Sequence, residues 1–351
     1  MLIDGMLGGF DDVRATAAAG EAAGYAGLWT GETMHDPFLQ IVQAAEVTER
    51  VSLGTSIAIA FGRTPMTLAT TSYDLARYTR GRFVLGLGSQ VKPHIERRFS
   101  MPWSHPAPRM REFVNALRAI WACWQDGTKL DFRGDFYTHT LMTPFFSPPA
   151  HEWGPPPVYL AGVGPLMTEV AGEVCDGFFF HGFTTPSYLR EVTLPALERG
   201  RAAGGHSGLG EGGLGEAELD HFDIAGPAFT CVADNEEDLA EAVRGAKQQI
   251  AFYASTPAYR GVLDHHGWGD LQPELTRLSK EGKWVEMGDL IDDDMVRTFA
   301  AVGDVPTVAR ELRERWAGVA TRLSFYAPYK FDAELRRTLL DELTSPVDGV
   351  S

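Results

Sequence analysis

The chain has 351 residues, of which 44% are hydrophobic, and a formal net charge of -16 at pH 7. This length and hydrophobic fraction allow a large buried core in one or two domains. The acidic balance argues against nucleic acid and anionic membranes as partners, because both would be repelled over much of the surface. We therefore expect the partner to be a small-molecule substrate.

The three cysteines, Cys123, Cys175 and Cys231, are too few and too widely spaced for a disulfide framework or a CxxC metal site. No apolar run of about 18 residues occurs, so no membrane span is expected. The first residues include acids in place of the basic start of a signal peptide. These features predict a cytoplasmic, unprocessed protein without a metal site.

Short apolar runs alternate with stretches of helical period, which is typical of βα units and a parallel sheet. Eight strands are predicted, and each but the last is followed by a helix. This pattern predicts an α/β fold, a (β/α)8 TIM barrel. The expected strands are 2–7, 27–30, 51–59, 82–89, 157–162, 176–182, 221–234 and 321–328. The expected helices include 11–24, 37–49, 65–79, 107–124, 164–175, 235–254 and 306–318.

Two segments interrupt the barrel pattern and are expected to be insertions in a single domain that spans 1–351. The first, near 126–153, contains a predicted hairpin at 129–139, and the second, at 255–304, shows no clear βα repeat. The glycine-rich tract 200–218 predicts a mobile surface connection. The alternative fold is an open doubly wound sheet, but no GxGxxG fingerprint follows the first strand.

The active site of a TIM barrel lies at the carboxyl ends of its strands. The stretch LAGVGPLMTEV at 160–170 follows the fifth predicted strand, and its small residues would let a ligand approach the backbone. Pro165 suits a first helical turn, whose free N–H groups bind anions such as phosphate. The alternative is an ordinary tight turn with a helix-starting proline.

Two further strand ends carry ionisable residues. In ETMHDPF at 32–38, His35 stands between two acids, although a solvated loop histidine is the alternative. In GSQVKPHIERRF at 88–99, Lys92, His94 and two arginines would form a positive rim for an anionic cofactor tail or substrate. The alternative is a solvated helical face. His181 stands at the predicted carboxyl end of the sixth strand.

Ser56 interrupts the apolar run of the third predicted strand, and the residues alone leave it as a turn residue, a core hydroxyl or part of a site. No GxSxG, HExxH or Walker sequence and no paired carboxylate spacing appears in the chain. A phosphate loop without an evident nucleophile indicates that a bound cofactor supplies the chemistry.

Four blocks in order resemble the luciferase-like flavin and deazaflavin oxidoreductases, and they are close to a mycobacterial-type subgroup that uses coenzyme F420. The blocks are GYAGLWTGETMHDPF (24–38), RVSLGTSIAIAFGRTPMTLA (50–69), GRFVLGLGSQVKPHIERRFSMPW (81–103) and PPVYLAGVGPLMTEVAGEVCDGFFFHGF (156–183). The resemblance implies an F420-dependent oxidoreductase that transfers a hydride between the cofactor and a small organic substrate. The alternatives are an FMN-dependent two-component monooxygenase and a catalytically degenerate flavin-binding relative. We also expect a homodimer.

The resemblance also implies site residues. It places a non-proline cis peptide at Ser56-Ile57, in a bulge that supports the central ring of the deazaflavin. It assigns the ring and the ribityl chain to Glu32, Thr33, Ser89, Gln90 and His94. It assigns the cofactor phosphate to Ala161, Gly162, Val163, Gly164, Pro165, Leu166 and Met167.

The chain departs from the sugar-phosphate dehydrogenases of that family. They carry an Asp-His pair where Glu32-Thr33 stands here, and a catalytic glutamate where Val91 stands. Sugar-phosphate oxidation is therefore not expected. His35 and Glu32 are the candidates for acid-base catalysis, with His35 as the proton donor.

Overall fold

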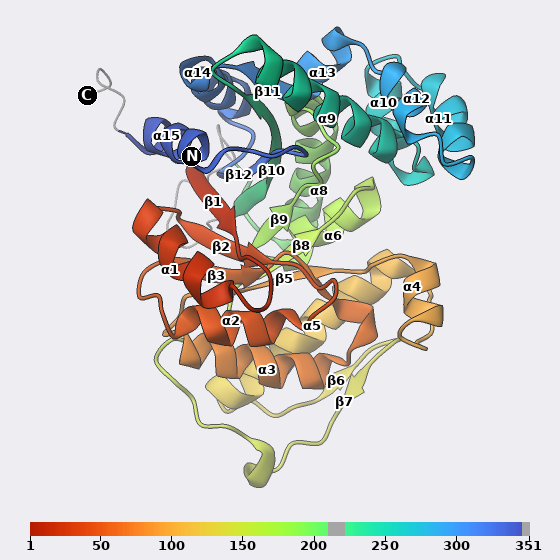
Figure 1. Cartoon of the computed structure of the whole chain (residues 1–351). Helices are drawn as coiled ribbons and strands as arrows, with labels where there is room; N and C mark the ends of the chain where they lie inside the picture. Colours follow the sequence, from red (N-terminus) through yellow and green to blue (C-terminus); the bar gives the residue numbers. More distant parts are fainter. Residues whose placement is uncertain (210–221, 346–351) are drawn as a thin grey trace.

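The computed structural model describes residues 1–209 and 222–345, and within them the chain forms a closed parallel barrel (Figure 1). The strands pair in the order β1-β2-β3-β5-β8-β9-β10-β12, and β12 pairs with β1 to close the ring. The predicted TIM barrel is confirmed. The strands are β1 (Leu2–Met6), β2 (Gly27–Thr30), β3 (Ser52–Thr55) with its continuation β4 (Ala58–Ile59), β5 (Phe83–Gly88), β8 (Val158–Ala161), β9 (Gly177–Phe179), β10 (Asp223–Val232) and β12 (Arg322–Tyr326).

The predicted helices form where local signals start and stop them. Thr64 accepts a hydrogen bond from the Thr67 amide ahead of α3, and Pro65 occupies the first turn of that helix. Gly24 ends α1 in the left-handed region, at φ 91°. These helices are α1 (Val13–Ala23), α2 (Pro37–Ala45), α3 (Pro65–Tyr78), α5 (Pro106–Gln125), α6 (Pro165–Val174), α9 (Glu236–Ala254) and α14 (Val305–Trp316).

Some helices differ from the sequence expectation. The last strand is followed by α15 (Ala333–Thr344), so the prediction that it has no helix is wrong. Asp332 caps α15 by accepting from the amides of Glu334 and Leu335. After β9 the chain continues through α7 (Pro186–Tyr188), the π-helical turn η3 (Leu189–Thr193) and α8 (Leu194–Gly204). The tract 200–218 thus begins in α8, and its part from 210 onward lies outside the described residues.

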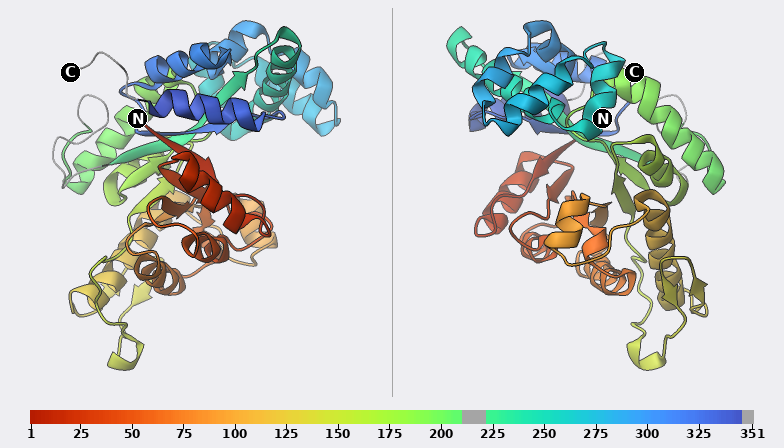
Figure 2. Two further views of the ribbon diagram at one scale, coloured as in Figure 1. Left: turned by 60° about the vertical axis from the view of Figure 1, so that its left-hand side comes forward. Right: turned by 90° about the vertical axis from the view of Figure 1, so that its right-hand side faces the viewer.

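The two insertions lie at opposite ends of the molecule (Figures 1 and 2). The first contains the predicted hairpin, formed by β6 (Phe132–Arg133) and β7 (Thr138–His139). The second contains α10 (Arg260–His265), α11 (Leu271–Lys280), α12 (Trp284–Asp289), α13 (Asp293–Phe299) and a strand, β11 (Ala300–Gly303).

Strand β11 corrects the expectation that 255–304 holds no βα repeat, because β11 and α14 form one. Its four residues, AAVG, have little β propensity of their own. The strand exists because it pairs in parallel with residues 229–232 of β10, the part of β10 that extends beyond β9.

An ionic cluster fills the amino-terminal end of the barrel interior. Arg322 donates to both Asp4 carboxylate oxygens, at 2.9 and 2.7 Å, and lies 3.8 Å from an Asp223 oxygen. Asp223 also accepts from the hydroxyls of Tyr159 and Thr321. Above this cluster, the interior holds Trp29, Val84, Tyr159, Phe179 and Ala225. The interior is thus packed, and the carboxyl ends of the strands, here called the barrel mouth, remain for a site.

In the described part of the chain, no helix is both long enough and apolar enough to cross a membrane.

Candidate active site

The interruption of the third strand is a backbone feature of the barrel mouth. The Ser56-Ile57 peptide bond is cis, as predicted, and it separates β3 from β4. The Ser56 amide donates to Thr30 of β2 at 2.7 Å, and the Ile57 carbonyl accepts from the Glu32 amide at 3.0 Å. The carboxyl ends of the second and third strands are therefore fixed to each other.

Glu32 connects these two strand ends through its side chain as well. Its carboxylate accepts from the Ile59 amide at 2.7 Å and forms an ion pair with Arg63 at 2.6 Å. The Glu32 side chain is only 8% exposed. Arg63 also reaches Asp36 at 3.2 Å, and Asp36 caps α2 by accepting from Phe38. Glu32 is therefore held in one orientation by two groups, the Ile59 amide and the Arg63 guanidinium.

The other predicted residues after β2 and β5 lie on one rim of the mouth. His35 is exposed, and its ring lies 4.9 Å from the ring of Phe10. The Thr33 carbonyl accepts from Arg98 at 2.8 Å, which joins this loop to the end of α4 (Lys92–Arg97), the helix that carries His94. His94 itself is exposed.

Ser89 and Gln90 form the connection between β5 and α4. The Ser89 hydroxyl donates to the Gln90 carbonyl at 3.1 Å, and the Gln90 side chain accepts from the Val91 amide at 3.0 Å. Gln90 has a φ of 59°, an uncommon conformation for a residue other than glycine. Its side-chain bond to the next amide supports that conformation locally.

The predicted phosphate loop joins β8 to α6. Gly164 stands at the N-cap of α6, with φ -98° and ψ 160°, and a Cβ placed there meets nothing within 4 Å. No side chain caps this helix, and its first turn carries no acidic residue. The first-turn amides of Leu166 and Met167 have no intrahelical partner. The loop is thus open and suits an anion, although an open βα turn without a ligand has the same geometry.

The structure adds an aromatic cluster that sequence reasoning missed. It consists of His181 after β9, Tyr253 near the end of α9, Tyr259 in the 3-10 turn η5 (Pro257–Tyr259), and Tyr326 at the end of β12. The His181 ring stacks on Tyr259 at 4.6 Å and meets Tyr253 edge-on at 4.7 Å. The hydroxyls of Tyr253 and Tyr326 are 2.6 Å apart. Only the strand-end position of His181 signalled this cluster, because its partners come from distant elements.

Burial shifts the pKa values of this cluster toward the neutral forms. Desolvation lowers the pKa of His181 to about 4 and raises the pKa values of Tyr259 and Tyr326. All three side chains are therefore uncharged near neutral pH.

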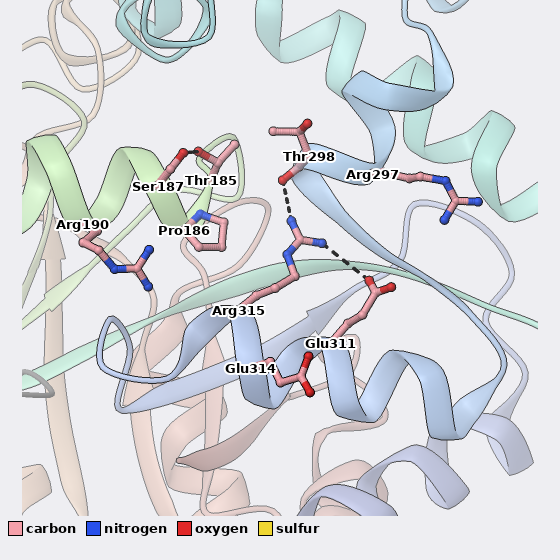
Figure 3. A pocket seen from close by; sticks show the side chains of 9 residues that line it. All are labelled: Thr185, Pro186, Ser187, Arg190, Arg297, Thr298, Glu311, Glu314 and Arg315. Carbon is pink, nitrogen blue, oxygen red and sulfur yellow. Dashed lines mark hydrogen bonds and ion pairs between the residues drawn. The ribbon is translucent and has the colours of Figure 1, made fainter.

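A cavity of about 540 Å³ lies elsewhere, between the α7 region and helices α13 and α14 (Figure 3). Arg315 is held at this cavity by donating to the Ala300 carbonyl at 2.7 Å and to the Thr298 carbonyl. The predicted site residues do not line this cavity. Within the described ranges, no group of three or more His, Cys, Asp or Glu side chains is placed to hold a metal ion.

Comparison with known proteins assigns the class of this barrel. The family model "Luciferase-like monooxygenase" matches residues 4–322, and the chain belongs to this family. Members of the family are oxidoreductases or monooxygenases. An uncharacterised protein of Mycobacterium tuberculosis (strain H37Rv) is 52% identical over 307 residues, which cover 88% of this chain and 87% of that protein.

Three further similarities concern proteins whose names include an activity. The 5,10-methylenetetrahydromethanopterin reductase of Methanopyrus kandleri is 25% identical over 320 residues, 86% of this chain and 84% of that protein. The solved coenzyme F420-dependent tetrahydromethanopterin reductase from that organism has a TM-score of 0.75, with 19% identity and 97% coverage of both chains. The FMN complex of a Baeyer-Villiger monooxygenase from Pseudomonas putida has a TM-score of 0.64, with 16% identity over 95% of this chain and 91% of that one.

Proposed function

We propose that this protein is a coenzyme F420-dependent oxidoreductase that transfers a hydride between the cofactor and a small organic substrate. The observation that carries the proposal is the open, uncapped N-terminus of α6 at the mouth of a luciferase-like barrel. An anionic cofactor tail fits there, because free amides and the helix dipole favour negative charge. Relatives whose names state F420 dependence support the choice of cofactor.

The proposed roles follow the positions of the side chains. The segment Ala161–Met167 would hold the phosphate, and the backbone at Ser56-Ile57 would support the ring. Thr33, Ser89, Gln90 and His94 would contact the ring and the ribityl chain from the rim. The bound deazaflavin would supply or accept the hydride, while the barrel aligns it with the substrate and limits access of water.

We propose His35 as the group that exchanges a proton with the substrate, because its exposed imidazole follows β2 between Glu32 and Asp36, whereas the other exposed imidazole of this rim, His94, lies on α4 between Lys92 and Arg97. The Glu32 carboxylate is held by Arg63 and the Ile59 amide. Its proposed contribution to acid-base chemistry is therefore electrostatic: a fixed negative charge close to His35 in the chain. We also propose that each chain is a single domain and that the protein is a cytoplasmic homodimer. Sedimentation of the purified protein tests the dimer.

The second candidate is an FMN-dependent monooxygenase supplied by a separate reductase. The FMN-bound neighbour with the same fold favours it. A third, a degenerate flavin-binding relative, is suggested by Thr33 and Val91 at positions where other members carry acid-base residues.

Parallel fluorescence titrations with coenzyme F420 and FMN test the proposal. We expect saturable F420 binding and much weaker FMN binding by the purified chain. Tight FMN binding without F420 binding would overturn the proposal in favour of the second candidate. Turnover of reduced F420 with any substrate would exclude the degenerate relative.

A further inference from the structure

One side of the barrel mouth is built from four aromatic rings: His181, Tyr253, Tyr259 and Tyr326, here called the aromatic wall. All four are partly buried. Two stand at the ends of barrel strands, Tyr253 comes from α9, and Tyr259 comes from η5, which lies within the second insertion. The insertion therefore contributes directly to the mouth of the barrel.

The strand that leads to His181 is paired with the strand that leads to the proposed cofactor loop. Ala161 of β8 pairs with Phe179 of β9, and the Gly162 amide donates to the Phe179 carbonyl at 3.4 Å. His181 follows Phe179 by two residues. Phe179 is the last residue of β9, and the Phe180 amide still donates to the Ala225 carbonyl of β10 at 3.0 Å, so His181 stands just beyond the carboxyl end of this strand.

The backbone fixes the tautomer of His181. Its Nδ1 accepts a hydrogen bond from the Phe183 amide at 3.0 Å, so in the neutral ring the proton is on Nε2. No described residue forms a hydrogen bond with Nε2, and this atom is not among the fully buried atoms that lack a partner. The ring therefore presents a free N–H donor to the mouth.

The tyrosines complete an uncharged environment. Either Tyr253 or Tyr326 donates to the other hydroxyl, which leaves one hydroxyl hydrogen for a further acceptor. Burial keeps the Tyr259 and Tyr326 hydroxyls protonated, because it raises their pKa values. A charged ligand group would lose its hydration here without gaining an opposite charge from the wall.

We propose that the aromatic wall is the substrate subsite and that His181 Nε2–H donates a hydrogen bond to the oxygen on the reacting carbon. The substrate class is then an uncharged aldehyde, ketone or corresponding alcohol. The donor would orient the oxygen and draw electron density from a carbonyl carbon. This inference rests on the proposed function, because the subsite is defined relative to the proposed cofactor site.

Two substitutions at one position separate the hydrogen bond from the packing. His181→Phe keeps an aromatic ring beside Tyr259 but has no donor. His181→Gln gives up the ring and can place an amide N–H near the position of Nε2. Melting temperatures and F420 titrations of both variants would establish that the fold and the cofactor site are retained.

The measurement is ¹⁵N-imidazole NMR of the protein, without cofactor and saturated with F420. The probes are acetone, cyclohexanone and benzaldehyde, with cyclohexylammonium and cyclohexanecarboxylate as charged controls. We expect the Nε2–H tautomer of His181, a saturable shift of its signal with the carbonyl probes, and no shift with the charged ones. Ligand-observed titrations should show about 10-fold weaker carbonyl binding in His181→Phe, the loss of one hydrogen bond, and a change of less than about 3-fold in His181→Gln.

Two results would overturn the inference: a His181 signal that responds to none of the carbonyl probes, or carbonyl binding by His181→Phe as tight as that of the unmodified protein. The F420 titration reports separately on the proposed function. If F420 does not bind but the ketones shift His181, the cofactor assignment fails and the carbonyl subsite stands.

Discussion

Gly164 stands at the N-cap of α6 with open space where a side chain would be, so the residue can be changed without a clash. We predict that Gly164→Asp weakens F420 binding at least about 10-fold, because its carboxylate would repel the phosphate and take its place at the amides. The same carboxylate stabilises a free helix N-terminus by roughly 0.3–1 kcal/mol, so the melting temperature should not fall. Fluorescence titration and thermal unfolding check both parts.

Gly164→Ala is the matched control, since it adds a Cβ without charge. It should retain F420 affinity within about 3-fold, because no atom lies within 4 Å of that Cβ. If the Asp variant bound F420 like the unmodified protein, the α6 loop would not be the phosphate site.

His35 is the proposed proton donor of the rim. We predict that His35→Asn lowers turnover by about 10²–10⁴-fold, the usual contribution of general acid-base catalysis, with F420 affinity little changed. His94→Ala should do the reverse, because His94 is proposed as a cofactor contact. Full activity of His35→Asn in steady-state assays would instead make this histidine a surface residue that packs on Phe10.

His181 should make stability depend on pH. Desolvation lowers its folded pKa to about 4, whereas an unfolded histidine titrates at about 6.5. Between these values the unfolded chain binds a proton that the folded chain does not, so stability falls as the pH drops below about 6.5. We predict that this residue contributes a loss of about 2 kcal/mol between pH 7 and pH 5.

Urea denaturation at both pH values measures that loss, with His181→Phe as the comparison. Other histidines with lowered pKa values, His139 and His266, remain in both proteins and cancel. An identical pH dependence in the variant would show that His181 titrates normally in the folded state.

At the scale of elements, the first and last strands of the barrel are joined by a buried ion pair. Arg322 begins β12 and Asp4 lies in β1, and both side chains are less than 10% exposed. We predict that Arg322→Met destabilises the protein by about 3–5 kcal/mol, because Asp4 would be left buried without its partner. Chemical denaturation gives the free energy of unfolding.

Arg337→Met offers the control for that substitution. Arg337 pairs with Asp341 within α15, and both side chains are about half exposed. Loss of this surface pair should cost less than about 1 kcal/mol. Equal effects of the two substitutions would mean that the Arg322 pair does not stabilise the closure of the barrel.

At the scale of the whole molecule, the second insertion has a core of its own that includes Phe229 and Cys231 of β10. The same strand runs through the barrel between β9 and β12. Because one strand belongs to both cores, we predict a single cooperative unfolding transition, with equal calorimetric and van't Hoff enthalpies in scanning calorimetry. Two resolved transitions would show that the insertion unfolds independently of the barrel.

The sequence alone determined the elements that local patterns specify. Apolar runs and helical periods placed the eight barrel strands and seven of their helices, and Pro165 marked the start of α6. The resemblance to the luciferase-like oxidoreductases placed the cis bond at Ser56-Ile57. These features depend on residues close together in the chain, so they can be predicted from local sequence patterns.

Tertiary structure alone decided the features that need distant partners. Strand β11 forms only by pairing with the end of β10. The Glu32–Arg63 ion pair joins residues that follow two different strands. The aromatic wall brings Tyr326 to within 2.6 Å of Tyr253, across 73 positions of sequence. Periodicity records which face of an element is apolar, whereas the barrel's closure and the path of the insertion determine which side chains meet at its mouth.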